Sequence, residues 1–304
     1  MTSSTHSPLP PVCKHGPAGV FTSALRRLVN NPEFSSDVKF VVGKERQEVF
    51  AHRCILACRC EVFHGMFSRQ PQTGRHTDLL ESPVVLSEVQ PEVFLAVIEF
   101  LYTNCVTLNN YIALEVLTSA VEYGLDDLRK LCVEFITDTL KVENVCEAMQ
   151  AAVTYGQFDM KETCLTFIEN HTREIVKTRG FHELSDLALV PILQSDSLLI
   201  DELELLCAVR EWAHVNSVVL EQPLPEVVKD AVKELRLALL SPDELTRLEK
   251  DNHKDSLVPV EQIAAAWKFH ALKKANTGAR PHLLQRRKGT RPRDHHRYLN
   301  LQHK

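Results

Sequence analysis

The sequence predicts an α+β unit, then an all-helical array, and finally a basic tail without regular structure. Three observations support this prediction. A β-rich run at 38–42 ends at Gly43, and residues 48–51 can return beside it as a hairpin. From Pro91 to about residue 272, apolar residues recur at the i, i+3, i+4, i+7 spacing of helices with one buried face. After about residue 276 this periodicity is lost and basic residues dominate, which favours disorder.

The elements follow in order from local patterns. Residues 1–19 are rich in Pro, Ser and Thr and predict a disordered leader. An amphipathic stretch comes next and stops at Asn31-Pro32. The apolar residues on its one helical face are Phe21, Leu25, Leu28 and Val29. Val84–Leu86 predicts a short strand, and Pro91 suits the first turn of a helix. Later helices are expected near 158–170, 184–194, 202–216, 226–238, 242–249 and 259–272.

Composition excludes several classes of protein. The chain has 304 residues, of which 44% are hydrophobic and 25% charged, as in globular proteins. No run approaches the ~18 apolar residues that would span a bilayer, and the first twenty residues lack the apolar core of a secretory signal. Nine cysteines without an export signal indicate reduced thiols. We therefore expect a protein of the cytoplasm, and also of the nucleus, with no membrane span.

The net charge of −5 conceals a strong asymmetry. Residues 268–304 contain 11 Lys and Arg against the single acid Asp294, whereas residues 1–267 carry a net charge of −15. The basic run Gln285–Arg293 could serve as a nuclear-import signal or touch an anionic partner. Only Tyr298 is available there to stack on bases, so nucleic acid is a weak candidate and a solvated tail is the simpler interpretation.

No motif predicts catalysis, a cofactor or a metal site. The chain contains no G-x-G fingerprint, no P-loop, no G-x-S-x-G elbow and no H-E-x-x-H. Cys54, Cys58 and Cys60 cluster without a distal ligand pair, so we interpret them as small core residues, leaving open a role in sensing oxidants. His295 and His296 fall in the basic tail and are expected to be solvated. The protein is therefore expected not to be an enzyme.

Several segments together resemble a BTB/POZ domain, and the helices that follow resemble a BACK domain. The BTB-like segments are Ser36–Phe40, His52–Ala57, Phe63–Phe67, Val85–Phe94 and Phe100–Thr103. The BACK-like segments are Val142–Val145, Ala151–Tyr155, Cys164–Ile168, Phe181–Ser185, Ile192–Asp196 and Glu202–Trp212. The resemblance covers roughly residues 20–250. It implies a BTB/POZ domain at 20–137 and a BACK domain at 138–250, and composition and periodicity add a disordered leader at 1–19, a helical region at 251–275 and a disordered basic tail at 276–304.

The resemblance implies a homodimer. In BTB domains the first helix packs against a second protomer, which assigns the stripe Phe21, Leu25, Leu28 and Val29 to the interface. The family also buries an aspartate there, close to a basic pair, and Asp37 with His52 and Arg53 matches it. The alternative is that the stripe packs on its own domain.

The resemblance also implies binding to a cullin-three ubiquitin ligase scaffold. In that subclass a φ-x-E motif follows the Met-Phe helix and contacts the cullin, and Leu79 and Glu81 fit this motif. Phe67 and Tyr123 match other positions near that surface, although a core role suits them equally. The alternative for Leu79 and Glu81 is an ordinary loop that leads into the next strand.

We expect no substrate-binding domain of known type in this sequence. Residues 250–304 are too few for two Kelch blades of ~50 residues, no MATH domain precedes the BTB-like segments, and zinc-finger spacings are absent. If the chain is an adaptor, its unidentified substrate protein is held by the BACK domain, the tail or a partner. Two rival functions stay open: an oligomerisation scaffold that engages no cullin, and a nuclear, nucleic-acid-associated regulator that uses the basic tail.

Overall fold

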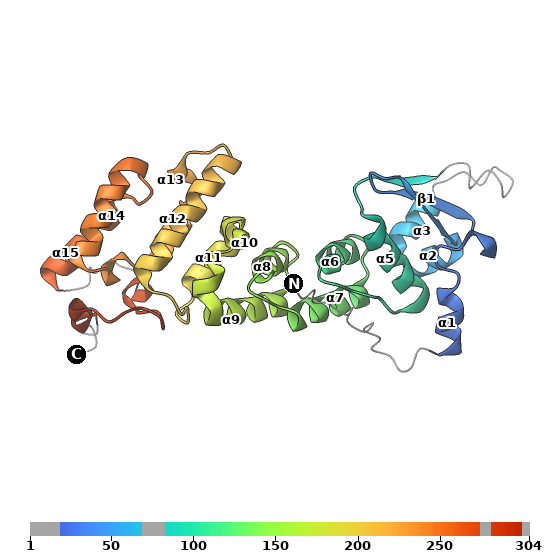
Figure 1. The fold of residues 1–304 in the computed structure, drawn as a ribbon, viewed down its shortest axis with the longest axis horizontal. Helices are drawn as coiled ribbons and strands as arrows, with labels where there is room; N and C mark the ends of the chain where they lie inside the picture. Colours follow the sequence, from blue (N-terminus) through green and yellow to red (C-terminus); the bar gives the residue numbers. More distant parts are fainter. Residues whose placement is uncertain (1–18, 69–82, 274–280, 300–304) are drawn as a thin grey trace, which may run out of the picture. The chain divides into compact units, whose positions relative to one another are not determined.

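The computed structural model describes residues 19–68, 83–273 and 281–299. Contacts between Cα atoms divide the chain into two compact units, unit 1 to Thr139 and unit 2 from Leu140 (Figure 1). Unit 1 combines a small sheet with helices, whereas unit 2 is helical, so the predicted fold class of an α+β domain followed by a helical array is confirmed. No helix in the described ranges is both long and apolar enough to cross a membrane.

The sheet of unit 1 has three strands in the order β2-β1-β3. Strands β1 (Val38–Val42) and β2 (Gln47–Ala51) form the predicted antiparallel hairpin, in which Phe40 lies opposite Val49. Strand β3 (Val84–Leu86) pairs parallel to β1. Gly43 ends β1 with a φ of +72°, and a Cβ there would lie 3.0 Å from Cδ of Pro91. The turn therefore requires glycine both for its backbone conformation and for space.

Helices cover the sheet and close the core of unit 1. They are α1 (Val20–Arg26), α2 (Arg53–Arg59), α3 (Glu61–Ser68), α5 (Pro91–Thr103), α6 (Ala113–Glu122) and α7 (Asp126–Asp138), with a 3-10 turn at Pro32–Phe34. Phe40 is fully buried, and its ring lies 5.9 Å from that of Phe63 on α3 and 4.9 Å from that of Phe94 on α5. These edge and tilted contacts join the sheet to two helices in one apolar core.

Unit 2 is built from helices and short 3-10 turns. They are α8 (Val145–Thr154), α9 (Phe158–Ile175), α10 (Arg179–His182), α11 (Asp186–Gln194), α12 (Glu202–Val219), α13 (Leu224–Val227), η2 (Ala231–Glu234), η3 (Leu237–Leu239), α14 (Pro242–Asp255) and α15 (Val260–Leu272). Trp212 lies in the core of the unit, and its indole N–H donates to the carbonyl oxygen of Leu184 at 2.8 Å. The hydrogen bond satisfies the one polar group of this buried ring.

The prediction of a disordered basic tail is wrong for residues 281–299, hereafter the strap. These residues form two 3-10 turns, η4 (Pro281–Leu284) and η5 (Asp294–Tyr298), joined by an irregular stretch that lies beside the start of α12 (Figure 1). Arg287 in this stretch is only 2% exposed. Periodicity does not reveal such a segment, because it is held largely by hydrogen bonds and ion pairs and its apolar residues are only half-buried.

Candidate functional site

The first helix presents an apolar surface. No residue of α1 is fully buried, and Phe21 is 75% exposed. Leu25, Leu28 and Val29 are half-buried where α1 and the turn after it pack against α5. The predicted stripe is therefore divided. Within the described chain Phe21 faces solvent, whereas the other three residues are partly covered by their own unit.

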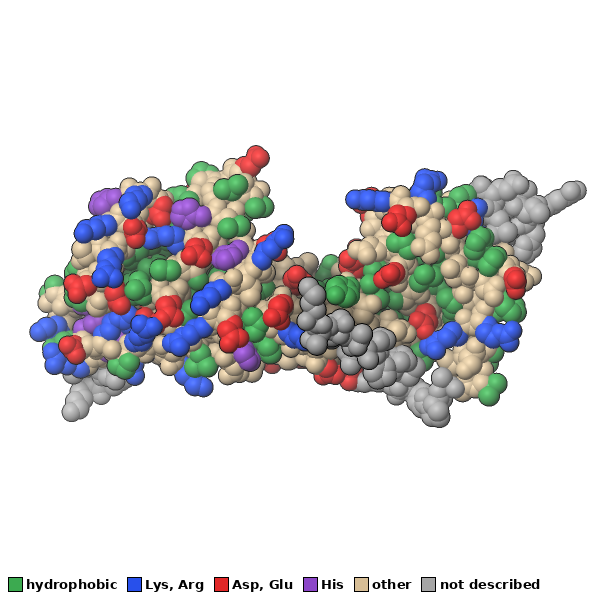
Figure 2. All heavy atoms as spheres, in the orientation of Figure 1, with side chains coloured by type: hydrophobic (Ala, Val, Ile, Leu, Met, Phe, Trp, Pro, Cys, Tyr) green, Lys and Arg blue, Asp and Glu red, His purple; other side chains and the backbone are tan. Residues whose placement is uncertain are grey.

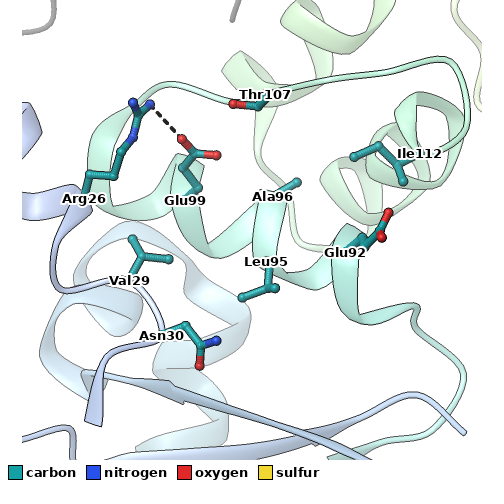
Figure 3. Close-up of a pocket in the computed structure, with 9 residues that line it drawn as sticks. All are labelled: Arg26, Val29, Asn30, Glu92, Leu95, Ala96, Glu99, Thr107 and Ile112. Atoms are coloured by element: carbon teal, nitrogen blue, oxygen red, sulfur yellow. Dashed lines mark ion pairs between the residues drawn. The ribbon is translucent and has the colours of Figure 1, made fainter. Parts of the chain in front are cut away.

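A cavity of about 440 Å³ lies beside this helix (Figure 3). Arg26 and Val29 line one side, and Leu95 and Glu99 of α5 line the other. The guanidinium of Arg26 lies 2.7 Å from the carboxylate of Glu99, so an ion pair bridges the mouth between the two helices. The lining combines apolar side chains with further polar ones, among them Asn30, Glu92 and Thr107, and the cavity has the size for a few side chains of a partner.

Asp37 caps the helix that follows the hairpin. Its Oδ1 accepts a hydrogen bond from the backbone N–H of Arg53, the first residue of α2, at 2.6 Å. The ring of His52 lies within hydrogen-bond distance of the Tyr102 hydroxyl, at 2.8 Å, and burial raises the pKa of that hydroxyl. The structure thus brings the half-buried Asp37 to the backbone of Arg53, whereas its place at a dimer interface stays a prediction. The cap ties β1 to α2.

Two of the proposed cullin contacts flank a single core ring. Phe67 is buried, and Tyr123 is half-buried with a pKa raised by burial. Both rings stack on Phe63, at centroid distances of 6.0 and 5.2 Å. Phe67 has a core role, and Tyr123 keeps part of its ring at the surface. Leu79 and Glu81 lie outside the described residues.

The cysteine cluster is only partly in the core. Cys60 is buried, but Cys54 and Cys58 are exposed, so the interpretation of all three as core residues is wrong for two of them. The reason is that α2 spans only Arg53–Arg59 and buries Leu56 alone. All eight cysteines in the described ranges are free thiols. Within the same ranges, no three His, Cys, Asp or Glu side chains are grouped to hold a metal ion.

In unit 2, Arg287 of the strap occupies a socket made of oxygen acceptors. Its Nη1 pairs with the carboxylate of Glu202, the first residue of α12. Its other nitrogens donate to three backbone carbonyls, those of Leu193, Ser195 and Glu234. Burial lowers the pKa of Arg287 and the Glu202 charge opposes this shift, so the guanidinium remains a cation. We call these four acceptors the arginine socket.

A second arginine of the strap joins two helices of unit 2. The guanidinium of Arg293 lies 2.8 Å from the carboxylate of Asp201, the N-cap of α12, and 2.8 Å from that of Glu244 on α14. Burial would raise the pKa of both acids, but hydrogen bonds from Arg293 and from nearby backbone amides bring each pKa below its ordinary value. Both acids are therefore ionised near neutral pH. Between these anchors, Arg291 pairs with Glu204.

The backbone of the strap also contacts unit 2 closely. The amides of Lys288 and Gly289 donate to the carbonyls of Asp196 and Leu198, at 2.8 and 2.9 Å. A Cβ built on Gly289 would lie 2.1 Å from the backbone nitrogen of Ile200. No side chain fits in that space, so glycine is required where the two backbones meet.

Histidines close the far end of the strap. His295 and His296 lie 3.1 and 2.9 Å from the carbonyls of Ala238 and Leu239 in η3. Burial, together with the neighbouring His270, lowers the pKa of His295 to about 4. The expectation that these two histidines are solvated is therefore wrong, because both rings pack against η3.

Sequence reasoning did not find this surface. The strap arginines and the acids of α12 are separated by more than 80 residues, and such pairs have no local signature. The acids at 201, 202 and 204 also have an ordinary explanation, because negative charge favours the first turn of a helix. Figure 2 shows basic and acidic side chains intermingled over this face of unit 2, so charge separation does not reveal the surface.

Comparison with known proteins finds relatives over nearly the whole chain. The family model for the BTB/POZ domain matches residues 27–140, that for BACK (BTB And C-terminal Kelch) matches residues 145–250, and no Kelch model matches. BTB/POZ domain-containing protein 19 of Bos taurus is 58% identical over 292 residues, which cover 96% of this chain and 98% of that protein. The protein of the same name from Homo sapiens is 58% identical over 290 residues, 95% of this chain and 97% of its own length.

A more distant relative shares a smaller part. BTB/POZ domain-containing protein 9 of Homo sapiens is 29% identical over 248 residues, which cover 75% of this chain but 40% of that protein. The two family models match in the order that the fold displays, and relatives with 58% identity align along almost their full length. The chain therefore belongs to the BTB/POZ family of protein-interaction adaptors that carry a BACK domain.

Proposed function

We propose that this protein is a non-enzymatic adaptor that dimerises through unit 1 and recruits a protein substrate to a cullin-three ubiquitin ligase. The observation that carries the dimer is the exposed apolar face of α1, where Phe21 is 75% exposed. An aromatic side chain at the start of a helix that also packs on α5 is well placed to anchor a second protomer. The cavity between α1 and α5 can accept partner side chains beside that anchor.

Dimerisation is tested with one aspartate at the proposed interface. Phe21→Asp should weaken self-association by about tenfold or more, because it places an unpaired charge at an apolar contact. Analytical ultracentrifugation of the full chain over a dilution series measures this change. Phe158→Asp is the matched control, because Phe158 is 79% exposed and lies on α9 in unit 2. Equal behaviour of the two variants would contradict the proposed interface.

The cullin contact rests on the φ-x-E motif of Leu79 and Glu81. Tyr123 is half-buried and stacks on Phe63 of α3, the helix from which this segment continues along the chain. One aromatic side chain of unit 1 therefore reaches the surface beside α3 and supports the proposed contact. Calorimetry with purified cullin-three scaffold measures the contribution of the motif. Leu79→Ala with Glu81→Ala should lose about 2 kcal/mol of binding free energy while the dimer stays intact.

The matched control for the cullin experiment changes exposed residues of the same types in unit 2. Leu187 is 69% exposed on α11, and the side chain of Glu211 on α12 is 70% exposed. Leu187→Ala with Glu211→Ala should leave cullin binding unchanged. A well-folded wild-type dimer that binds no cullin would overturn the adaptor mechanism and favour the oligomeric scaffold.

A nucleic-acid-associated regulator is the weaker candidate. Arg287, Arg291 and Arg293 are engaged by acids of unit 2, so the basic run offers them to a phosphate backbone only after those ion pairs break. Deleting residues 276–304 tests this alternative, provided that urea unfolding shows unit 2 of the shortened chain to be folded. Loss of nuclear entry or of nucleic-acid binding in that variant would support it against the adaptor.

A further inference from the structure

The strap is attached to unit 2 mainly by hydrogen bonds and ion pairs, and its apolar residues Leu283, Leu284 and Leu299 are only half-buried. Its buried residues are Arg287, Thr290 and His296, and none of them is apolar. The buried hydrophobic residues in the described part of unit 2 all precede the strap, the last being Phe269 on α15. Apolar burial is the main cohesive force in a folded unit. The core of unit 2 can therefore persist when the strap leaves, and the strap behaves as an occupant of a surface.

The arginine socket selects one side-chain type. Three backbone carbonyls and the Glu202 carboxylate converge on the Nε, Nη1 and Nη2 atoms of Arg287. A guanidinium presents five N–H donors in a fixed plane, whereas an ammonium presents three on a single nitrogen and cannot reach acceptors on opposite sides. Lysine would fill the socket with the same charge but leave several acceptors without donors.

The remaining contacts define a sequence pattern. Arg287, Gly289, Arg291 and Arg293 follow the spacing Arg-x-Gly-x-Arg-x-Arg, and each meets a feature of unit 2. The glycine allows the backbone to approach Ile200, and the last two arginines meet acids of α12 and α14. A side chain at the glycine would break the backbone hydrogen bonds without changing the charge of either surface.

We propose that this surface of unit 2 is a binding site for an arginine-bearing peptide of another protein, and that the strap occupies it within the chain. The site consists of the arginine socket together with Asp201, Glu204 and Glu244. The groups that meet the strap's arginines are carboxylates and carbonyl acceptors, which favours a cationic peptide over a phosphate backbone. The buried Arg236 lies beside them, where it pairs with Asp196 and donates to the carbonyl of Gln285 in the strap. The idea that this site holds the substrate of an adaptor rests on the proposed function. Peptide binding is measured without a cullin, so the peptide site and the cullin adaptor function can each fail without the other.

The occupied state is autoinhibitory. A peptide from outside has to compete with a strap that is always present at high local concentration, so binding in trans is weak until the strap detaches. Thr290 lies in the strap between the socket and Arg291, and its buried hydroxyl has no hydrogen-bond partner among the described residues. This side chain therefore adds no hydrogen bond to the attachment of the strap.

The experiment uses the full chain with Gly289→Val, which detaches the strap at its closest contact and leaves all the acceptors in place. The probe is a fluorescein-labelled peptide of residues 284–294, and the readout is fluorescence anisotropy. The variant should bind the peptide at least about tenfold more tightly than the wild-type chain. A peptide with Arg287→Lys, which has the same net charge, should bind at least about tenfold more weakly.

Matched variants of the site provide the control. In the Gly289→Val chain, Glu202→Gln should abolish peptide binding, whereas Glu211→Gln should not, because Glu211 lies on the same helix with its side chain 70% exposed. Absence of peptide binding by a cooperatively melting Gly289→Val chain would overturn the proposal. Equal binding of the arginine and lysine peptides would also overturn it, since only general charge attraction would then be involved.

Hydrogen exchange on the wild-type chain tests the same proposal without a variant that could fail to fold. The amides of Lys288 and Gly289 should exchange at least about a hundredfold faster than buried amides of α12, because the strap opens alone. If the strap amides and the α12 amides both exchange only when unit 2 unfolds as a whole, the strap is an integral part of the unit and the proposal is refuted. Protection that rises with protein concentration would assign the site to the strap of a second copy, which also refutes it.

Discussion

Replacing Arg287 by alanine should lower the free energy of unfolding of unit 2 by about 3 kcal/mol. The side chain of Arg287 is completely buried and that of Glu202 is 2% exposed. The substitution removes every hydrogen bond of the socket and leaves the Glu202 carboxylate and three carbonyls without their donor. Removing one partner of a buried pair costs about 3–5 kcal/mol. The lower end applies because the strap can detach and admit water.

Urea unfolding followed by tryptophan fluorescence measures this change. Both tryptophans, Trp212 and Trp267, lie in unit 2, so the signal reports that unit alone. Arg286→Ala is the matched control, because Arg286 is the preceding residue and is exposed. It should change the free energy by less than about 0.5 kcal/mol.

A second pair of variants separates the ion pair from the loss of packing. Arg287→Met with Glu202→Leu removes both charges and should recover the part of the stability that the unpaired Glu202 carboxylate costs, whereas the three carbonyls of the socket still lack a donor. If Arg287→Ala lies within about 0.5 kcal/mol of the wild type, with an unchanged dependence on urea, the reasoning is refuted. Glu202 would then be solvated in the native protein.

Three further predictions concern pH, the first cap and the thiols. Burial lowers the pKa of His295 to about 4, below the ~6.5 of the unfolded chain, so between these values the unfolded state binds the extra proton and stability falls as the pH falls. Between pH 7.5 and pH 5 the free energy of unfolding of unit 2 should fall by about 1 kcal/mol, which is half of what the full pKa difference would give, because the ring is partly solvated. Urea titrations at the two pH values measure this fall, and a His295→Asn chain should lack it. The same pH profile in both chains would contradict the assignment to His295. Asp37→Ala should destabilise unit 1 by about 1–2 kcal/mol in thermal melts followed by circular dichroism, since it removes a charged hydrogen bond to the first amide of α2, and an unchanged melting temperature would exclude such a cap. The exposed Cys54 and Cys58 should react with Ellman's reagent at least about a hundredfold faster than Cys132, which is buried on α7 and whose pKa is raised by burial to about 12. Mass spectrometry of the labelled peptides measures the rates. Equal rates would mean that α7 opens readily and exposes Cys132.

The sequence predicts the parts of this fold that depend on neighbouring residues. The hairpin of β1 and β2 follows from the β-rich run that ends at Gly43, whose positive φ is a local requirement of the turn. The long helices follow from apolar residues at helical spacing. The cysteine cluster shows the limit of such reasoning, because exposure depends on how α2 packs and not on its own residues.

The stripe of α1 lies between these cases. Its periodicity predicts one apolar face but not what covers that face, and the structure divides it between α5 and solvent. A period of 3.6 residues determines which side chains share a face, whereas the partner of that face is a property of the whole unit. The dimer therefore remains a prediction that Phe21→Asp can test.

By itself the sequence determined the order of strands and helices, the BTB and BACK segments, and the opposite charges of the body and the tail. Only the tertiary structure decided that Arg287 inserts into a socket that begins at Glu202, and that Gly289 lies against Ile200. The physical reason is the range of the interactions. Hydrophobic periodicity and turn conformation act within a few residues, but a buried ion pair needs two charges that are distant in the chain and enclosed by the same fold.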